Sequence, residues 1–227
     1  MTNPSRSRRA ELRPRAEPVQ ARAQVSRQKV LDAAHALLKT HGARQLTTLA
    51  IAEASGVSIG AIYRFFPNKE SIICRLYEEK LERIRALGLA NRPGAPGLTP
   101  WRDYFSGYFL ALKAAEREVD FDFSLADAIF ALPELWEIEQ RHTLLFADQL
   151  VVDMKACGAR WSDAALFDLA VNLYGMEAST WAYWRYAKVY PTLAIERLVQ
   201  ATLAVMAPAM EGEPDPGWSI SRETLAP

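Results

Sequence analysis

Residues 46–70 read LTTLAIAEASGVSIGAIYRFFPNKE, and this stretch decides the fold of the N-terminal part of the chain. Apolar residues recur at helical spacing on both sides of Gly56, which predicts one short helix before this glycine and another after Ser58. Glycine tolerates the unusual backbone angles of a tight turn, and serine is a favourable N-cap for the helix that follows. Two short helices joined in this way are typical of a helix–turn–helix motif.

The second of these helices has the composition of a DNA-recognition helix. Ile59, Gly60 and Ala61 are small or apolar, and such residues permit close approach to base edges and to thymine methyl groups. Tyr63 and Arg64, and Lys69 shortly beyond the helix, have side chains that reach phosphates or bases.

Three nearby residues have alternative interpretations. Phe66 is expected in the core, because aromatic residues at helical spacing usually pack inside. Phe65 fits the DNA-facing surface and the core equally well. Lys69 also fits a solvated lysine in the first turn of a helix, with no ligand at all.

Charge is divided unevenly along the chain. The 227 residues carry 27 basic and 27 acidic side chains, yet residues 1–88 have a net charge of +8 and residues 89–227 a net charge of −8. A basic half suits a polyanionic partner, and the acidic half then has another role. With 50% hydrophobic residues, the chain can form a buried core, which excludes wholesale disorder and a collagen-like fold.

The composition also predicts the location of the protein. The only two cysteines, Cys74 and Cys157, lie in apolar helical patterns, which favours reduced thiols over a disulfide scaffold. No apolar run approaches the roughly 18 residues of a membrane span. The basic N-terminus is not followed by the apolar segment of a secretory signal. We therefore expect a cytoplasmic protein without a membrane partner.

Proline placement predicts an all-α chain of about nine helices, since proline breaks helix interiors and suits helix boundaries. Ser26 is the expected N-cap of the first helix, a short helix is expected around residues 121–131, and the last helix is expected to end before Pro208. A loop is expected from Gly88 to Pro100. The predicted divisions are a disordered basic arm (1–24), a helix–turn–helix domain (25–70), a ligand-binding and dimerisation domain (71–210) and a C-terminal tail (211–227).

From Val30 to Leu81 the sequence resembles the TetR family of transcriptional repressors. The resemblance is carried by Ala33-Ala34, Gly42, Leu46-Thr47-Thr48, Ile51-Ala52, Gly56-Val57-Ser58, Gly60, Ile62-Tyr63, Phe65-Phe66 and Asn68-Lys69-Glu70. It implies DNA contacts from Thr48, the start of the recognition helix, Tyr63 and Lys69. Leu49 stands where some members have a polar or basic residue. The full set of expected DNA-binding residues is Thr47, Thr48, Ser58, Ile59, Gly60, Ala61, Tyr63, Arg64, Phe65 and Lys69.

An enzymatic interpretation has one motif in its favour. Residues 56–60, GVSIG, match the G-x-S-x-G nucleophile elbow of esterases, but that motif needs a preceding strand, and the pattern here predicts helices only. The three histidines have no metal-binding spacing, and no phosphate-binding glycine loop occurs. We expect no catalytic residue, no metal and no cofactor.

The acidic half is expected to bind a small-molecule effector and a second copy of the chain, as the resemblance implies. The helix from Asp163 to Ala187 has two apolar stripes, and a helix of this kind must bury both. Glu177 interrupts one stripe; it either pairs with an arginine such as Arg185 or Arg141, or anchors a ligand. The residues expected to bind an aromatic or cationic effector are Tyr108, Trp136, Tyr174, Glu177 and Trp181.

These observations predict a homodimeric, ligand-responsive repressor that an effector releases from a pseudo-palindromic operator in double-stranded DNA. A non-sensing DNA-binding protein or an activator with the same N-terminal domain is the alternative. The arginines of residues 1–24 either contact DNA or serve only as a solubilising tail.

Overall fold

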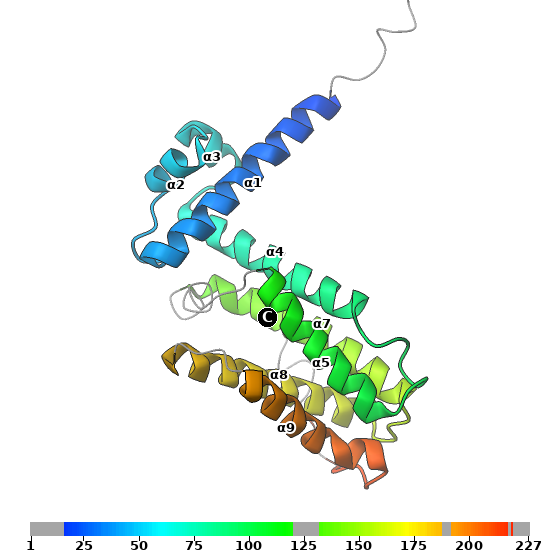
Figure 1. Ribbon diagram of the computed structural model, residues 1–227. Helices are drawn as coiled ribbons and strands as arrows, with labels where there is room; N and C mark the ends of the chain where they lie inside the picture. The colour runs from blue at the N-terminus through cyan, green and yellow to red at the C-terminus, as the bar shows by residue number, and fades with distance from the viewer. Residues whose placement is uncertain (1–15, 120–131, 188–191, 218, 220–227) are drawn as a thin grey trace, which may run out of the picture. The chain divides into compact units, whose positions relative to one another are not determined.

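The computed structural model describes residues 16–119, 132–187, 192–217 and 219. This part of the chain contains eight helices and no strand, so the predicted all-α class is confirmed. The helices are α1 (Ala16–His41), α2 (Thr48–Ser55), α3 (Ile59–Phe65), α4 (Lys69–Ala90), α5 (Trp101–Glu118), α7 (Glu134–Ala156), α8 (Asp163–Ala187) and α9 (Thr192–Glu211) (Figure 1). The helix expected around residues 121–131 lies outside the described residues.

The chain divides into two compact units between Ile73 and Cys74. We call the described residues up to Ile73 the head, and those from Cys74 onward the body. The sequence predicts this division at residue 70.

The head is built from three helices that pack against one another in pairs, α1 with α2, α1 with α3 and α2 with α3. Leu31 and Leu38 of α1, Ile51 of α2 and Ile62 of α3 are all fully buried. Phe66, directly after α3, is also buried, as the sequence predicts. The apolar spacing of each helix therefore forms the core that fixes α2 and α3 at their turn.

Helix α1 begins eleven residues earlier than the sequence predicts. It starts at Ala16 and runs through Ser26, the expected N-cap, so residues 16–24 are helical and not a disordered arm. The reason is composition, because this segment is rich in alanine and glutamine, which favour helix. Pro18 is compatible with this start because it lies in the first helical turn. Residues 1–15 of the predicted arm lie outside the described residues.

Two helices of the body extend past their predicted ends. Helix α4 continues through Gly88 to Ala90, where the sequence predicts a loop. A side chain at Gly88 would collide with Leu112 of α5, so the glycine permits close packing of these two helices. Helix α9 continues through Pro208 to Glu211. Pro208 lies inside the last turn, where it has no N–H to donate to the carbonyl oxygen of Ala204, so the helix continues with one hydrogen bond fewer.

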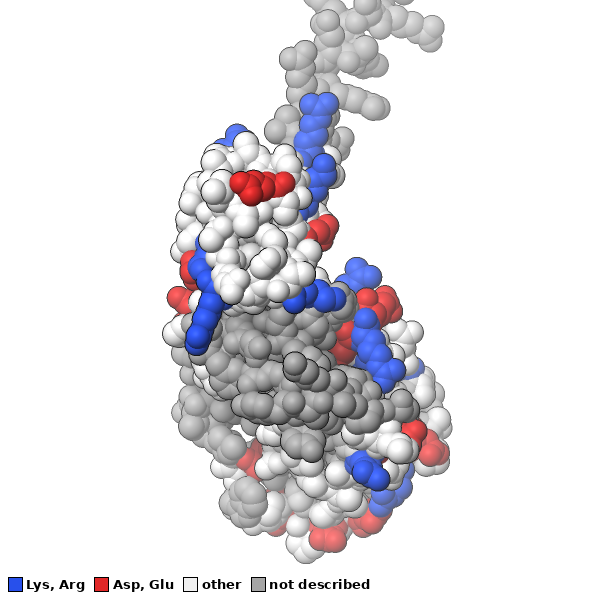
Figure 2. Space-filling model, turned by 60° about the vertical axis from the view of Figure 1, so that its left-hand side comes forward, with Lys and Arg blue, Asp and Glu red and all other residues white. Residues whose placement is uncertain are grey.

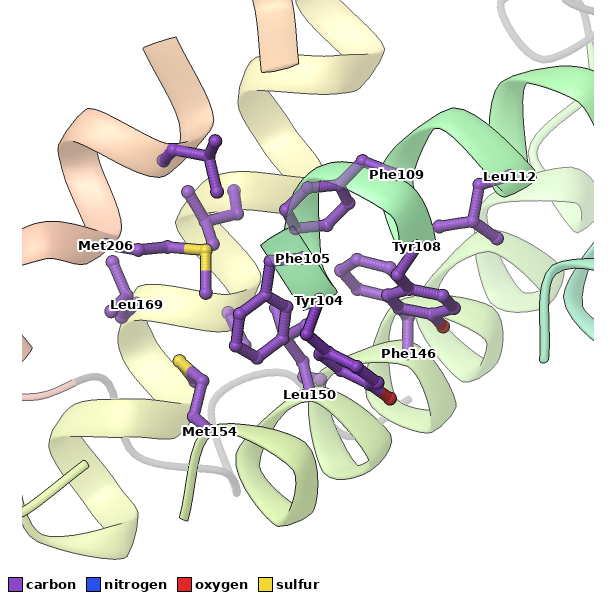
Figure 3. Packing of buried hydrophobic residues seen from close by; sticks show 14 of the residues in the cluster. Tyr104, Phe105, Tyr108, Phe109, Leu112, Phe146, Leu150, Met154, Leu169 and Met206 are labelled. Atoms are coloured by element: carbon purple, nitrogen blue, oxygen red, sulfur yellow. The ribbon is translucent and has the colours of Figure 1, made fainter. Parts of the chain in front are cut away.

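The body has a continuous apolar core in which α7 packs on α8 and α9 packs on both α5 and α8. The aromatic stripe of α5 lies at its centre, with Tyr104, Phe105 and Tyr108 almost fully buried. Figure 3 shows these rings surrounded by side chains of neighbouring helices, among them Phe146, Leu150 and Met206.

Helix α9 is long and apolar enough to cross a membrane by length and composition, contrary to the sequence expectation. Its Ile195, Val199 and Leu203 are buried in the core of the body. The opposite side carries exposed Glu196 and Arg197. This is the pattern of a helix that belongs to the core of a helical bundle.

Candidate functional site

The turn of the helix–turn–helix motif is held by caps at three points. The hydroxyl of Thr47 accepts a hydrogen bond of 3.1 Å from the amide of Ala50 and caps α2. Gly56 ends α2 with a φ of +67°, in the left-handed region that favours glycine. The hydroxyl of Ser58 accepts from the amide of Ala61 at 3.3 Å and caps α3, as the sequence predicts. These interactions set the path of α3 relative to α2.

Three polar side chains expected to bind DNA meet at one recess of the head. Thr48 at the start of α2 and Tyr63 on α3 join their hydroxyl groups in a hydrogen bond of 3.2 Å. Lys69, at the start of α4, donates from Nζ to the carbonyl oxygen of Leu46 at 3.1 Å. All three line a recess of about 370 Å³, together with Leu46, Thr47, Pro67, Asn68 and Glu70. Hydroxyl and ammonium groups arranged in this way are suited to hold a phosphate oxygen.

The remaining residues expected on this interface differ in exposure. Gly60 and Arg64 are exposed, and Ile59 is 42% exposed. Ala61 and Phe65 are half-buried, so Phe65 contributes to both the surface and the packing. Figure 2 turns the side of the head that carries α2 and α3 forward, and most of this surface is uncharged.

Sequence reasoning missed two features of the head. Leu49, which is not among the expected DNA-binding residues, is 58% exposed at the second position of α2. Asn68 caps α4 by accepting a hydrogen bond of 2.8 Å from the amide of Ser71. The asparagine three residues before a serine was the signal for this cap, and the cap fixes the start of the helix that carries Lys69.

A half-buried carboxylate of the body connects three helices. Glu139 of α7 accepts hydrogen bonds from the hydroxyl of Tyr174 on α8, at 2.6 Å, and from the hydroxyl of Tyr77 on α4. Burial raises the pKa of Glu139, although the bond from Tyr174 acts in the opposite direction. Burial, with the nearby Glu139 charge, raises the pKa of Tyr174 as well. Sequence reasoning did not single out Glu139, which occurs in an ordinary helical pattern.

A second buried ionic group lies between α5 and α8. Lys113 is 3% exposed, and its ammonium group contacts Glu116 at 2.9 Å and also pairs with Glu177. Burial lowers the pKa of Lys113, whereas the Glu116 charge raises it. Glu177 therefore pairs with Lys113, whereas the sequence suggests an arginine; the side chain of Arg185, one of those arginines, lies outside the described residues. A lysine four residues from the aromatic stripe of α5 was the available signal.

The other residues expected to bind an effector are not all brought together. Tyr108 is buried, its ring lies 5.9 Å from that of Phe109, and burial raises its pKa to about 12. Trp136 is 56% exposed, so it does not form an interior wall; Leu135 and Ile138 are buried on the core-facing side of α7, and Trp136 lies on another side of the helix. Trp181 belongs to α8, but its side chain lies outside the described residues.

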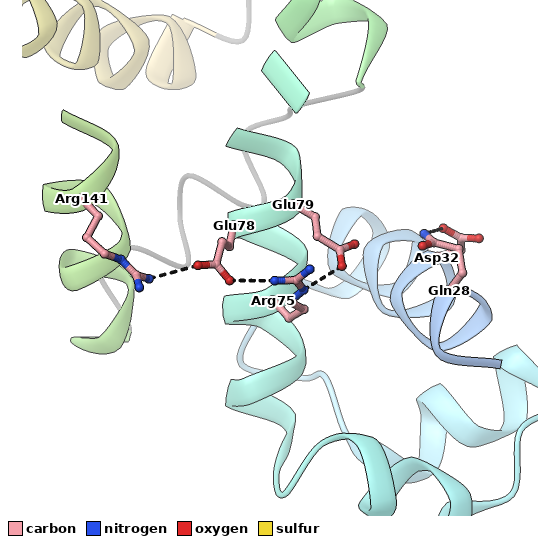
Figure 4. A network of polar contacts seen from close by, with 6 residues as sticks. All are labelled: Gln28, Asp32, Arg75, Glu78, Glu79 and Arg141. Atoms are coloured by element: carbon pink, nitrogen blue, oxygen red, sulfur yellow. Dashed lines mark hydrogen bonds and ion pairs between the residues drawn. The ribbon is translucent and has the colours of Figure 1, made fainter. Parts of the chain in front are cut away.

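An ion-pair chain joins α4 to α7 on the surface of the body (Figure 4). Arg75 pairs with Glu79 at 2.7 Å and with Glu78 at 3.1 Å, and Glu78 also accepts from Arg141 at 3.1 Å. Arg141, one of the arginines that the sequence suggests as a partner of Glu177, thus pairs with Glu78 of α4.

Helices α8 and α9 form an open groove of about 700 Å³ on the body. Small residues make up much of its lining, and the lining residues are Asn172, Gly175, Met176, Ser179, Thr180, Ala194, Arg197, Leu198 and Ala201.

Comparison with known proteins identifies the head. Residues 30–76, which contain both helices of the motif and the lysine of the recess, match the model described as bacterial regulatory proteins, tetR family. Over these residues the head is similar to tetR-family regulatory proteins. The resemblance carried by the sequence motifs is thereby confirmed.

Two curated tetR-family relatives are similar over the same region. Both are the HTH-type transcriptional repressor KstR. The protein from Rhodococcus jostii (strain RHA1) is 35% identical over 68 residues, which cover 30% of this chain and 32% of that protein. The protein from Mycolicibacterium smegmatis is 32% identical over 76 residues, which cover 34% of this chain and 36% of that protein. The match thus spans about a third of the length of these relatives.

Solved structures extend the likeness of fold to the body. A transcriptional regulator from Rhodococcus sp. Rha1 has a TM-score of 0.65 at 15% identity and covers 83% of this chain and 99% of its own. A regulator from Pseudomonas aeruginosa PAO1 has a TM-score of 0.58 at 19% identity. The match covers 87% of this chain and 94% of that protein. A TetR-family regulator from Haemophilus influenzae has a TM-score of 0.57 at 16% identity. The match covers 82% of this chain and 98% of that protein. The helix–turn–helix head with a larger helical body is therefore the fold of tetR-family regulators.

The curated relatives and the geometry at residues 56–60 both argue against an enzyme. The relatives are regulators of transcription. The G-x-S-x-G match at residues 56–60 joins two helices, and Ser58 is used as a cap, so it is not a strand-to-helix elbow. Within the described residues, no group of three or more His, Cys, Asp or Glu side chains is placed to hold a metal ion.

Proposed function

We propose that this protein is a DNA-binding transcriptional repressor whose head inserts α3 into the major groove of operator DNA. The observation that carries the proposal is the meeting of Thr48, Tyr63 and Lys69 at one recess beside α2 and α3. Phosphate contacts of this kind position a recognition helix on the duplex. The net charge of +8 in residues 1–88 supplies the attraction to DNA.

The test is selection of DNA fragments by the purified protein, followed by affinity measurement in a mobility-shift assay. A repressor of this kind enriches one sequence motif with two-fold symmetry. Enrichment of no motif contradicts the proposal. A reporter driven by a promoter that contains the selected motif then separates repression from activation, the alternative that the head alone leaves open.

The protein acts as a homodimer in this proposal, with α8 and α9 packed against a second copy. The open groove between these helices is lined by small residues, which permit close approach of helices from a partner. A two-fold dimer places two heads on two half-sites of a palindrome. Gly175→Arg is the sharpest variant, because Gly175 lies in the groove and has open space beside it in the single chain.

We expect Gly175→Arg to leave the helical content unchanged and to shift the protein from dimer to monomer in sedimentation equilibrium. Leu145→Arg is the matched control, since Leu145 is exposed on α7, away from the groove lining. A dimer that survives Gly175→Arg argues against this interface.

The effector site in this proposal is the interior of the body around Tyr108, Tyr174 and Glu177. The carboxylates of Glu116 and Glu177 contact the ammonium group of Lys113, and the carboxylate of Glu139 accepts a hydrogen bond from the hydroxyl of Tyr174. This excess of negative charge beside aromatic rings favours an aromatic molecule with a cationic group. Binding there releases the operator by shifting the population between two arrangements of the heads.

A matched pair of small molecules tests the effector class. An arylalkyl amine and the carboxylic acid of the same carbon skeleton share their apolar surface and differ in charge. We expect the amine to raise the melting temperature and to release DNA, and Glu177→Gln to weaken both effects. Equal responses to the amine and the acid contradict a cationic effector. We place the protein in the cytoplasm, where its proposed DNA partner lies.

A further inference from the structure

The head exposes two large aliphatic side chains at the starts of its two short helices. Leu49 is the second residue of α2 and is 58% exposed, and Ile59 is the first residue of α3 and is 42% exposed. A single exposed aliphatic residue is common on protein surfaces and needs no explanation. Leu49 and Ile59, however, both lie close in the helices to residues of the recess that contains Thr48 and Tyr63.

The connection follows from the helix geometry. Leu49 is adjacent to Thr48 in α2, and Ile59 lies one turn before Tyr63 on α3, on the same side of that helix. The hydrogen bond between Thr48 and Tyr63 joins the two helices at this point. Leu49 and Ile59 therefore flank the hydroxyl pair that our proposed function assigns to phosphate.

Few polar groups are left in this region to read bases. Between Gln45 and Phe66 the chain has two charged residues, Glu53 and Arg64. The hydroxyls of Thr47 and Ser58 cap helices, and that of Ser55 accepts from the amide of Val57 at 3.2 Å inside the turn. Most hydrogen-bonding side chains of the motif thus form hydrogen bonds within the motif and stabilise its conformation.

We propose that Leu49 and Ile59 read the 5-methyl groups of thymines in the major groove, so that the operator has thymine at the bases these two side chains face. The proposal rests on the proposed function, because it assumes that α3 enters the major groove. Thymine is the one base that presents a methyl group on the major-groove edge, and aliphatic side chains discriminate it by burying that methyl.

The experiment replaces single thymines of the selected operator by deoxyuridine. This change removes one methyl group and leaves every hydrogen-bonding group of the base pair in place. Burial of one methyl group predicts a three- to five-fold loss of affinity at each thymine that is read. Deoxyuridine at thymines outside the protected region is the control and changes the affinity less than 1.5-fold.

Protein variants assign each methyl to a side chain. We expect Leu49→Ala to weaken operator binding about five- to ten-fold and to abolish the deoxyuridine effect at one thymine per half-site, because the contact is already lost. Ile59→Ala acts likewise at a different thymine. Leu49→Met, which keeps an apolar side chain, retains methyl sensitivity. Leu98→Ala is the matched control, since Leu98 is an 82% exposed leucine of the body.

The outcomes distinguish a failure of this inference from a failure of the proposed function. If selection enriches no motif, the proposed function is overturned and the inference with it. If a motif is enriched but no deoxyuridine substitution weakens binding, or if its effect is the same in Leu49→Ala and Ile59→Ala as in the unaltered protein, the inference alone is overturned. Loss of helical signal in Leu49→Ala is checked by circular dichroism, and Leu49→Met then decides by its methyl sensitivity.

Discussion

The hydroxyl of Tyr104 donates a hydrogen bond of 2.7 Å to the carboxylate of Asp153, and both side chains are buried in the body. Asp153 also accepts a hydrogen bond of 2.9 Å from Gln149 on the other oxygen, and Arg92 lies 3.7 Å from that oxygen. A buried carboxylate is stable only when its oxygens are paired in this way. This contact therefore attaches the loop after α4, and helix α5, to α7.

Tyr104→Phe is expected to reduce the free energy of unfolding of the body by about 1–3 kcal/mol. The variant keeps the ring and removes one hydrogen bond from a buried charged acceptor. Urea denaturation followed by circular dichroism measures the change. Tyr63→Phe serves as the control, because Tyr63 is 51% exposed and its hydroxyl bonds only at the surface. An unchanged midpoint for Tyr104→Phe contradicts the assigned role.

Lys69→Ala is expected to weaken DNA binding on all sequences alike and to reduce the slope of log affinity against log salt by about one unit, as for the loss of one phosphate contact. Tyr63→Phe weakens binding by a similar factor with a smaller change of slope, since the hydroxyl is uncharged. Lys155→Ala, on an exposed lysine of the body, is the control. If Lys69→Ala leaves both the DNA affinity and its salt slope unchanged, Lys69 does not contact phosphate, and the alternative interpretation of a solvated lysine holds.

The sequence predicts the head better than the body for a physical reason. In the helix–turn–helix motif, local signals such as Gly56 and Ser58 set the boundaries of α2 and α3, and these caps form wherever the helix packs. The start of α1 has no such signal, and the sequence places it too late. The effector site depends on which helix faces meet in three dimensions. Nothing local in the sequence indicates that Lys113 pairs with Glu177 or that two tyrosines converge on Glu139. Trp136 is expected to line the effector site, yet it is exposed, because the core-facing side of α7 is the one that carries Leu135 and Ile138.

His142 is expected to stay neutral far below the usual range of histidine. Burial, with the nearby charge of Arg85, lowers its pKa to about 4. In the unfolded chain this histidine takes up a proton near pH 6.5, so its contribution to stability is present above that pH and is lost as the pH falls toward 4. An NMR titration of the ring protons measures the pKa, with His142→Phe identifying the signal.

The raised pKa of Glu139 has the opposite effect on stability, so the denaturation curves of the unaltered protein and His142→Phe are compared at each pH. A ring that titrates near pH 6.5 contradicts its burial.

The arginines before α1 provide the last prediction. Residues 1–15 contain Arg6, Arg8, Arg9, Arg13 and Arg15, and the helix begins at Ala16, so their deletion leaves the described helices intact. An arm in front of a head that occupies the major groove can follow the backbone or enter the neighbouring minor groove, where arginine is favoured by narrow A·T-rich sequence. We expect deletion of residues 1–15 to lower DNA affinity and to make its salt dependence shallower, because fewer counterions are released, while dimerisation and the effector response are kept. Replacing the five arginines by glutamine at full length is the matched variant and should reproduce the effect. If both variants bind DNA with unchanged affinity and salt slope, the arm is only a solubilising tail and the head alone is the DNA-binding unit.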